Sequence, residues 1–365
     1  MTPASGPAST SNADAAIGPE ALEARIAAAH DVRFSDVLEA VAYLRDSGDS
    51  VIAGGSLTLG LGNGLSDLDL VISGEASAES SRVPLQHWVK SLRVDVWKLR
   101  QDAMDELVGR AERVLGGDEP VDGAFGDIFE EADLKLLHRV AFGIPLDGPP
   151  LRPAATRSYR DIACDLLARE YAERMRESAF VAQAALASGD AIAAAFNARL
   201  AVQSVLHATL CAHRRPFTGD KWLRERLDMD APALAELHES FAVLPEDLDG
   251  TGDFVRRAIE ACESRSGCDL APAALSTQVR FDAGDLELFA AGPESYLLSV
   301  ERGGVWEVDD AEADTWRRLE HPSWECDASD DAALRLSFGL FALGVAKLRW
   351  ERGLPIAELR FGELA

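Results

Sequence analysis

Residues 52–70 read IAGGSLTLGLGNGLSDLDL, and the order of glycines, leucines and aspartates in this stretch predicts the fold. A short apolar run leads into Gly54, Gly55 and Ser56, and a second apolar run begins near Leu68. Short apolar runs bounded by glycine and polar residues are typical of strands joined by a loop. The stretch therefore predicts two strands, at 51–53 and 68–73, on either side of a glycine-rich loop.

Asp67 and Asp69 stand two positions apart at the start of the second predicted strand. Side chains two apart in a strand lie on the same face, so the two carboxylates share one face while Leu68 and Leu70 face a core. Two carboxylates on one face repel each other unless a cation lies between them. Mg²⁺ is the cation expected, because it binds carboxylates together with substrate phosphates.

A further strand is predicted at 92–99, where LRVDVWKL alternates apolar and polar residues. If this strand lies beside the previous one, Asp95 adds a third carboxylate. Three carboxylates can hold two metal ions about 4 Å apart, an arrangement that activates an attacking hydroxyl and stabilises the leaving oxygen. The alternative is that Asp95 is an exposed strand carboxylate beside Arg93.

The glycine-rich loop is predicted to bind phosphate through Gly54, Gly55 and Ser56. Glycine lets the backbone approach phosphate oxygens, and a helix start after it presents free N–H groups. The Ser56 hydroxyl adds a donor, and Ser66, directly before Asp67, is assigned to the same nucleotide site. The alternative is a plain turn between two strands, with its aspartates on a solvated face.

The Gly-Ser pair at 55–56 is followed eleven positions later by the first aspartate of Ser-Asp-Leu-Asp. This pattern resembles the polymerase-beta-type nucleotidyltransferase superfamily, most of all the branch with kanamycin and streptomycin nucleotidyltransferases. The resemblance covers about 100 residues. It implies that Gly55 and Ser56 contact phosphate, that Asp67 and Asp69 bind metal, and that Asp95 is the third carboxylate or the general base.

Four parts follow one another along the 365 residues. Residues 1–19 are rich in Ala, Ser, Pro and Thr and are predicted to be a disordered tail. Residues 20–150 form the predicted nucleotidyltransferase domain, which ends in the Pro- and Gly-rich run IPLDGPPLRP at 144–153. A helical bundle is predicted at 151–270, and a small winged-helix-like module of strands and helices at 275–365. The predicted fold class is α+β, with a mixed sheet in the first domain.

Lys221 lies in TGDKWL at 218–223, close to a predicted helix start. It resembles a lysine that, in small-molecule nucleotidyltransferases, commonly reaches the triphosphate from the helical domain. A positive charge near a helix N-terminus favours phosphate binding. The alternative is a surface lysine beside a buried Trp222.

The C-terminal part contains YLLSVERGGVW at 296–306 and DDAEADTW at 309–316. The pattern predicts a strand, a hairpin, a second strand and a capped helix, followed by a last helix at about 332–350. It resembles the small peptide-binding domains of ribosomal-peptide modification pathways. That resemblance implies a peptide or carrier acceptor rather than a free sugar.

Charge and composition restrict the partners. The formal net charge is -26 and the sequence pI is near 4.6, which disfavours nucleic acid. The sequence shows no signal peptide and no apolar run of about 18 residues, so no membrane contact is expected. Five cysteines without CxxC spacing indicate reduced thiols in a cytoplasmic protein. A homodimer stays open.

The function expected from these observations is transfer of a nucleoside monophosphate from an NTP to an acceptor hydroxyl. ATP is the NTP expected. The acceptor is a small molecule or a peptide. A cationic acceptor could contact Glu130, Glu131 and Asp133, whose alternative role is a solvated helix start. Two other functions stay open, a protein-modifying (AMPylating) enzyme and a non-catalytic nucleotide-binding scaffold.

Overall fold

The protein is described here from a computed structural model, which describes residues 17–74, 83–116, 128–151, 157–245, 247–276, 278–292, 294–299, 304–319, 323–325, 330–342, 346–350, 361–362 and 364. The chain divides into two compact units. Unit 1 is drawn from Met1–Asp118, Glu130–Leu166 and His213–Arg226, and unit 2 from Glu119–Phe129, Leu167–Ala212 and Leu227–Ala365. The domain ends at 150 and 270 stay predictions.

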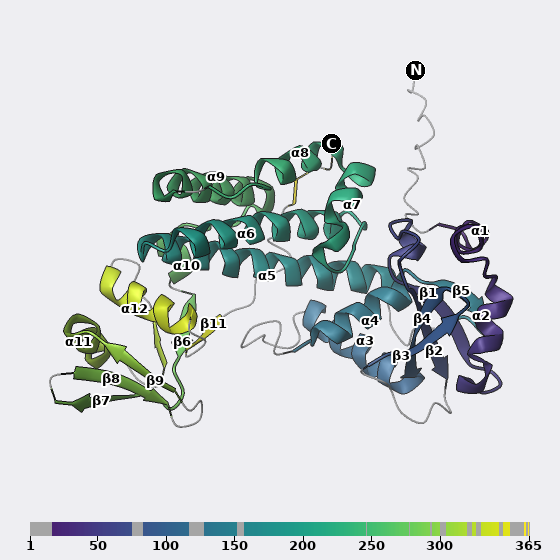
Figure 1. The fold of residues 1–365 in the computed structure, drawn as a ribbon, viewed down its shortest axis with the longest axis horizontal. Coiled ribbons are helices and arrows are strands. Elements are labelled where there is room, and N and C mark those ends of the chain that lie inside the picture. Colours follow the sequence, from purple (N-terminus) through teal and green to yellow (C-terminus); the bar gives the residue numbers. More distant parts are fainter. Residues whose placement is uncertain are drawn as a thin grey trace, which may run out of the picture. The chain divides into compact units, whose positions relative to one another are not determined.

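Unit 1 is built on a five-stranded mixed sheet of order β3-β4-β2-β1-β5 (Figure 1). The strands are β1 (Ser50–Gly54), β2 (Leu68–Gly74), β3 (Leu85–Val89), β4 (Leu92–Arg100) and β5 (Ile144–Asp147). β2 and β4 run parallel, and every other neighbouring pair is antiparallel. The strands predicted at 51–53, 68–73 and 92–99 are confirmed.

The two faces of this sheet differ in chemistry. Leu68, Leu70 and Ile72 of β2 are fully buried in a core with Val94 and Val96 of β4. That core includes apolar residues of α1 (Pro19–His30) and α2 (Phe34–Ala40). The alternation of side chains along a strand then sends Asp69 and Asp95 to the other face. In Figure 1, α3 (Gln101–Gly116) and α4 (Glu131–Ala141) lie on the side of the sheet opposite α1 and α2.

The last residues of the predicted tail, 17–19, are part of unit 1. The Ile17 amide donates a hydrogen bond to the Thr58 carbonyl at 3.0 Å, and Pro19 begins α1. Proline suits the first position of a helix because its missing N–H has no helical partner there. Residues 1–16 of the tail lie outside the described residues.

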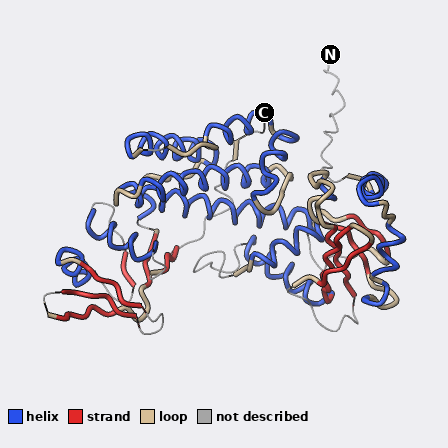
Figure 2. Tube along the Cα trace, viewed as in Figure 1, coloured by secondary structure: helices blue, strands red, loops and turns tan. Residues whose placement is uncertain are grey.

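Helices make up the middle of the chain (Figure 2), as the sequence predicts. They are α5 (Tyr159–Ala187), α6 (Ala191–Ala212), α7 (Leu223–Asp230), α8 (Pro232–Ser240), α9 (Leu248–Ser266) and α10 (Pro272–Ser276). Within unit 2, α6 packs along α9. Among the described residues, no helix combines the length and the apolar character needed to cross a membrane.

The C-terminal segment contains two three-stranded antiparallel sheets. One joins β10 (Ser323–Glu325), β6 (Val279–Asp282) and β11 (Lys347–Trp350), and the other joins β7 (Glu287–Ala291), β8 (Glu294–Ser299) and β9 (Gly304–Val308). Helices α11 (Asp310–Arg318) and α12 (Asp331–Ala342) complete it. The winged-helix-like character of this segment stays a prediction.

The helix predicted at 332–350 is wrong at its C-terminal end. α12 stops at Ala342, and residues 347–350 form β11, which pairs with β6. Leu348 lies opposite Phe281 and Trp350 opposite Val279. Pairing with a distant strand overrides the local helical pattern at this position.

We expect Gly55→Ala to destabilise unit 1 more than Gly60→Ala. Both glycines have positive φ, 82° and 76°, so each alanine carries a similar backbone cost of roughly 1–2 kcal/mol. A Cβ at position 55 would lie 2.1 Å from Asp69 Oδ2, whereas at position 60 the nearest atom is 3.5 Å away. The overlap should add about 1–3 kcal/mol. Urea unfolding measures both losses, and equal losses would contradict the close contact.

Candidate functional site

Three carboxylates lie together at one end of strands β2 and β4. In the parallel register Asp69 is directly paired with Asp95, and Asp67 precedes the first residue of β2. Asp95 is only 6% exposed, so the exposed-strand alternative for this residue is wrong. Asp69 and Asp95 thus lie on neighbouring strands, with Asp67 directly before the first of them, and their metal-binding role stays a prediction.

Arg93 lies between two of these carboxylates. Its Nη2 donates to Asp95 Oδ2 at 3.0 Å and also contacts Asp67 Oδ2. Arg93 is two residues before Asp95 on β4, so the same strand period places both side chains on one face. The guanidinium supplies the positive charge that two neighbouring carboxylates need.

A second arginine, Arg139 of α4, pairs with Asp69. Arg139 Nε lies 3.0 Å from Asp69 Oδ1, and the guanidinium carbon stands 4.6 Å from the ring centre of Trp97. Trp97 Nε1 donates to the same carboxylate oxygen at 3.3 Å. Arg139 Nη1 is buried and has no hydrogen-bond partner among the described residues, so this arginine retains a donor for an anionic ligand.

Burial raises the pKa of Asp69 above its ordinary value. The charge of Asp67 acts in the same direction, whereas Arg139 and the hydrogen bond from Trp97 act against it. A carboxylate that is buried next to another carboxylate binds a cation readily, because the cation removes both penalties.

The glycine-rich loop is shaped by close contacts with the site. Gly54 lies opposite Asp69 in the pairing of β1 with β2, and a Cβ on it would lie 2.9 Å from Arg139 Cβ. Gly55, with positive φ, lies against the Asp69 carboxylate. Any larger residue at either position would push Arg139 or Asp69 away.

The two predicted serines differ in their surroundings. Ser56 begins the short helix η2 (Leu57–Leu59), and its side chain makes no capping hydrogen bond. Ser66 is buried, and its Oγ accepts a hydrogen bond from the Asn63 amide at 3.0 Å. Ser66 therefore closes the loop that precedes Asp67, and its role as a nucleotide ligand stays a prediction.

Lys221 belongs to the same unit as the carboxylates. It is exposed in η4 (Asp220–Trp222), directly before α7, with its Nζ 4.9 Å from the ring centre of Trp222. The segment that carries it is joined to α4, because His138 Nε2 donates to the Pro216 carbonyl at 3.4 Å and its ring packs edge-on against Phe217. Burial lowers the pKa of His138 to about 4, so this imidazole is neutral and has a packing role.

The acidic residues at the start of α4 have structural partners. Glu130 is the N-cap residue, Glu131 pairs with Lys135, and Asp133 pairs with Arg110 of α3 at 2.9 Å. These contacts favour the helix-start interpretation over an acceptor pocket.

Carboxylate oxygens are the ligand type that a hard divalent cation prefers. Asp95 Oδ1 is buried and has no hydrogen-bond partner among the described residues, so one carboxylate oxygen is available for a ligand. In the described part of the chain, no group of three or more His, Cys, Asp or Glu side chains is gathered closely enough to hold a metal ion. Arg93 contacts one oxygen of Asp67 and one of Asp95, so a cation placed between those two oxygens would take the position of its guanidinium.

Arg139 and Trp97 are the site residues that the sequence did not single out. Trp97 could have been found, because it follows Asp95 by two positions on the same strand face. Arg139 gives no such signal, because its approach to Asp69 depends on how α4 packs on the sheet.

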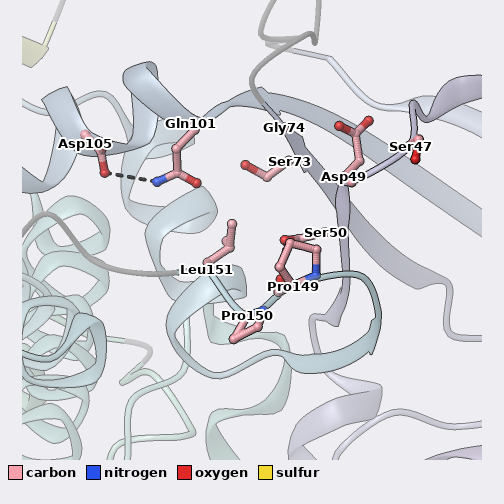
Figure 3. A pocket seen from close by; sticks show the side chains of 11 residues that line it. Ser47, Asp49, Ser50, Ser73, Gly74, Gln101, Asp105, Pro149, Pro150 and Leu151 are labelled. Carbon is pink, nitrogen blue, oxygen red and sulfur yellow. Dashed lines mark hydrogen bonds between the residues drawn. The ribbon is translucent and has the colours of Figure 1, made fainter.

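A cavity of about 560 Å³ lies at the opposite end of strand β2 (Figure 3). It is lined by residues of β1, β2 and α3 and of the loops at 47–49 and 149–151: Ser47, Gly48, Asp49, Ser50, Ser73, Gly74, Gln101, Asp105, Pro149, Pro150 and Leu151. Ser50 lies opposite Ser73 in the β1–β2 register, four residue pairs away from Gly54 and Asp69. The cavity is therefore separate from the carboxylates.

No protein-family model matches this chain, and no curated protein matches it. Among solved structures, a nucleotidyltransferase-like protein from Exiguobacterium sibiricum 255-15 is similar over 63% of this chain and 77% of its own, at 12% identity and a TM-score of 0.31. At this TM-score the likeness is too low to assign a function, which has to come from the residues of the site.

We expect Asp69→Asn to raise the melting temperature at pH 7. A carboxyl whose pKa is raised by folding destabilises the folded state above that pKa, and the penalty disappears as the pH falls below the ordinary value of 3.8. The difference from wild type should therefore close near pH 4. Calorimetry at both pH values measures it.

Asp102→Asn is the control for this comparison. Arg100 lowers the pKa of the exposed Asp102, so the same substitution there should give no gain in stability at pH 7. A lower melting temperature for Asp69→Asn than for wild type at pH 7 would show that the Arg139 and Trp97 contacts outweigh the burial of the carboxylate.

Proposed function

We propose that this chain is a nucleotidyltransferase that moves a nucleoside monophosphate from an NTP, with ATP as the first candidate, to a hydroxyl of a small-molecule or peptide acceptor. The observation that carries the proposal is the direct pairing of Asp69 with Asp95 on parallel strands, with Asp67 beside them and Gly55 against Asp69. Buried carboxylates in such an arrangement need a cation, and a nucleotide substrate brings one.

The residues that would hold Mg²⁺ are Asp67, Asp69 and Asp95, and two ions are expected. When bound, Mg²⁺ would neutralise the triphosphate and polarise the reacting oxygens. The backbone at 54–56 approaches the phosphates, and the Ser56 hydroxyl donates to them. Arg139 and Lys221 add positive charge. Catalysis then consists mainly of positioning and charge stabilisation.

In the transfer step, the acceptor oxygen forms a bond to the α-phosphorus and the bond from that phosphorus to the bridging oxygen breaks. Pyrophosphate leaves with the electron pair of the broken bond. The hydroxyl proton passes to a carboxylate, for which Asp95 is proposed because one of its oxygens has no partner among the described residues.

The overall charge supports an acceptor other than nucleic acid. A chain of net charge -26 repels a polynucleotide, whereas a few cationic side chains at one site suffice for a single triphosphate. An acceptor with ammonium groups would gain from the same net negative charge. A peptide acceptor is the alternative that the C-terminal segment favours.

The test is incubation with Mg²⁺, each of the four NTPs labelled at the α-phosphate, and a panel of aminoglycosides, neutral sugars, peptides, RNA and DNA. Label on a small molecule or peptide, with pyrophosphate release, supports the proposal. Extension of RNA or DNA ends at physiological salt contradicts the acceptor class, and nucleotide binding without turnover of any acceptor favours the non-catalytic scaffold.

Asp95→Asn should lower the transfer rate about 100-fold or more while the fold survives, because it removes one negative charge from the proposed metal site. Asp147→Asn is a matched control, since Asp147 is an exposed carboxylate of β5 that pairs with Arg45. Initial rates and circular dichroism of both variants give the answer. Transfer by Asp95→Asn at a tenth of the wild-type rate would remove Asp95 from the chemistry.

Lys221→Ala should weaken nucleotide binding about tenfold, because it removes one charged donor to the triphosphate. Lys135→Ala removes the same charge from α4, where Lys135 pairs with Glu131, and should leave affinity unchanged. Calorimetric titration with α,β-methylene ATP and Mg²⁺ measures both. Equal affinities for wild type and Lys221→Ala would place Lys221 outside the nucleotide site.

A further inference from the structure

Arg93 occupies the position that a metal ion would need between two of the proposed ligands. A single nitrogen, Nη2, contacts both Asp67 Oδ2 and Asp95 Oδ2. A divalent cation placed between these two oxygens would occupy the position of Nη2 and would repel the guanidinium at contact distance, so the guanidinium is the group displaced.

The two arginines of the site differ in how firmly they are held. The Arg139 side chain is 16% exposed and stacks on Trp97, whereas the Arg93 side chain is 41% exposed. Both side chains keep a buried nitrogen without a hydrogen-bond partner among the described residues, Arg93 Nε and Arg139 Nη1, so exposure and stacking are what separate them. Arg93 therefore leaves its position at lower cost than Arg139 does.

We infer that Arg93 is a built-in counter-ion that competes with divalent metal for Asp67 and Asp95 and that turns to the triphosphate when metal and nucleotide bind together. The inference rests on the proposed function. Without nucleotide, Arg93 neutralises the carboxylates and keeps metal affinity low. With nucleotide present, the displaced guanidinium donates hydrogen bonds to phosphate oxygens, which are strong partners for arginine. Arg93 is thus a positioning residue that couples the two ligands.

Competition and coupling predict opposite changes in Mn²⁺ affinity and in nucleotide affinity for one variant. Arg93→Gln should bind Mn²⁺ alone about 5-fold more tightly than wild type does, because its competitor is gone. In the presence of saturating Mn²⁺, the same variant should bind α,β-methylene ATP about 10-fold more weakly. A purely structural role would weaken both ligands together.

Free Mn²⁺ is measured by its electron paramagnetic resonance signal, and nucleotide affinity by calorimetry. Arg100→Gln is the matched control, since Arg100 ends the same strand, pairs with Asp102 and carries the same charge. It should leave both affinities unchanged. Arg93→Lys keeps the charge and should stay close to wild type in Mn²⁺ affinity, which gives a second variant if Arg93→Gln does not fold.

Mn²⁺ affinity of Arg93→Gln that equals wild type, or an equal gain in Arg100→Gln, would overturn the competition, and so would loss of the wild-type Mn²⁺ affinity in Arg93→Lys. Failure of the proposed function has a different signature. In that case, Asp67→Asn and Asp95→Asn would bind Mn²⁺ and nucleotide as wild type does, or no variant would bind either ligand. Either result would also contradict the inference about Arg93.

Discussion

The parallel pairing of β2 with β4 is the constraint on which unit 1 depends. It sets Asp69 beside Asp95 and gathers three negative charges at one end of the sheet, two of them largely buried. Buried charge of one sign is costly unless opposite charge or a metal ion compensates it. Arg93 and Arg139 contact the aspartates and supply that opposite charge.

Helix α4 connects this site with the rest of unit 1. Gly54 and Gly143 let the helix approach β1 closely, because a Cβ at either position would overlap the helix or the strand. Arg139 then reaches Asp69, and the preceding residue, His138, holds the segment that carries Lys221. Residues 213–226 consequently fold with the carboxylates, although they follow α6 in the sequence.

Several elements show why local pattern is an incomplete guide. β3, α3 and β5 were not among the predicted elements. β3 is an edge strand with mostly exposed side chains, so it lacks the apolar alternation of a covered strand. β5 contains Pro145, which suits an edge strand but made the run at 144–153 look like a boundary loop. α3 does carry an apolar stripe, at Met104, Leu107, Val108 and Ala111, and could have been predicted.

The sequence by itself determined the strands at 51–53, 68–73 and 92–99, the glycine turn, and the place of Asp67 and Asp69 at the start of the second strand. These features follow from backbone geometry over a few residues, since the side-chain period of a strand is two. Only the tertiary structure decided that β4 lies parallel to β2 with Asp95 at Asp69, that α4 brings Arg139 to the carboxylate, and that residues 347–350 form a strand. Those outcomes depend on contacts between segments far apart in the chain, whose free energies of packing and pairing no local pattern contains.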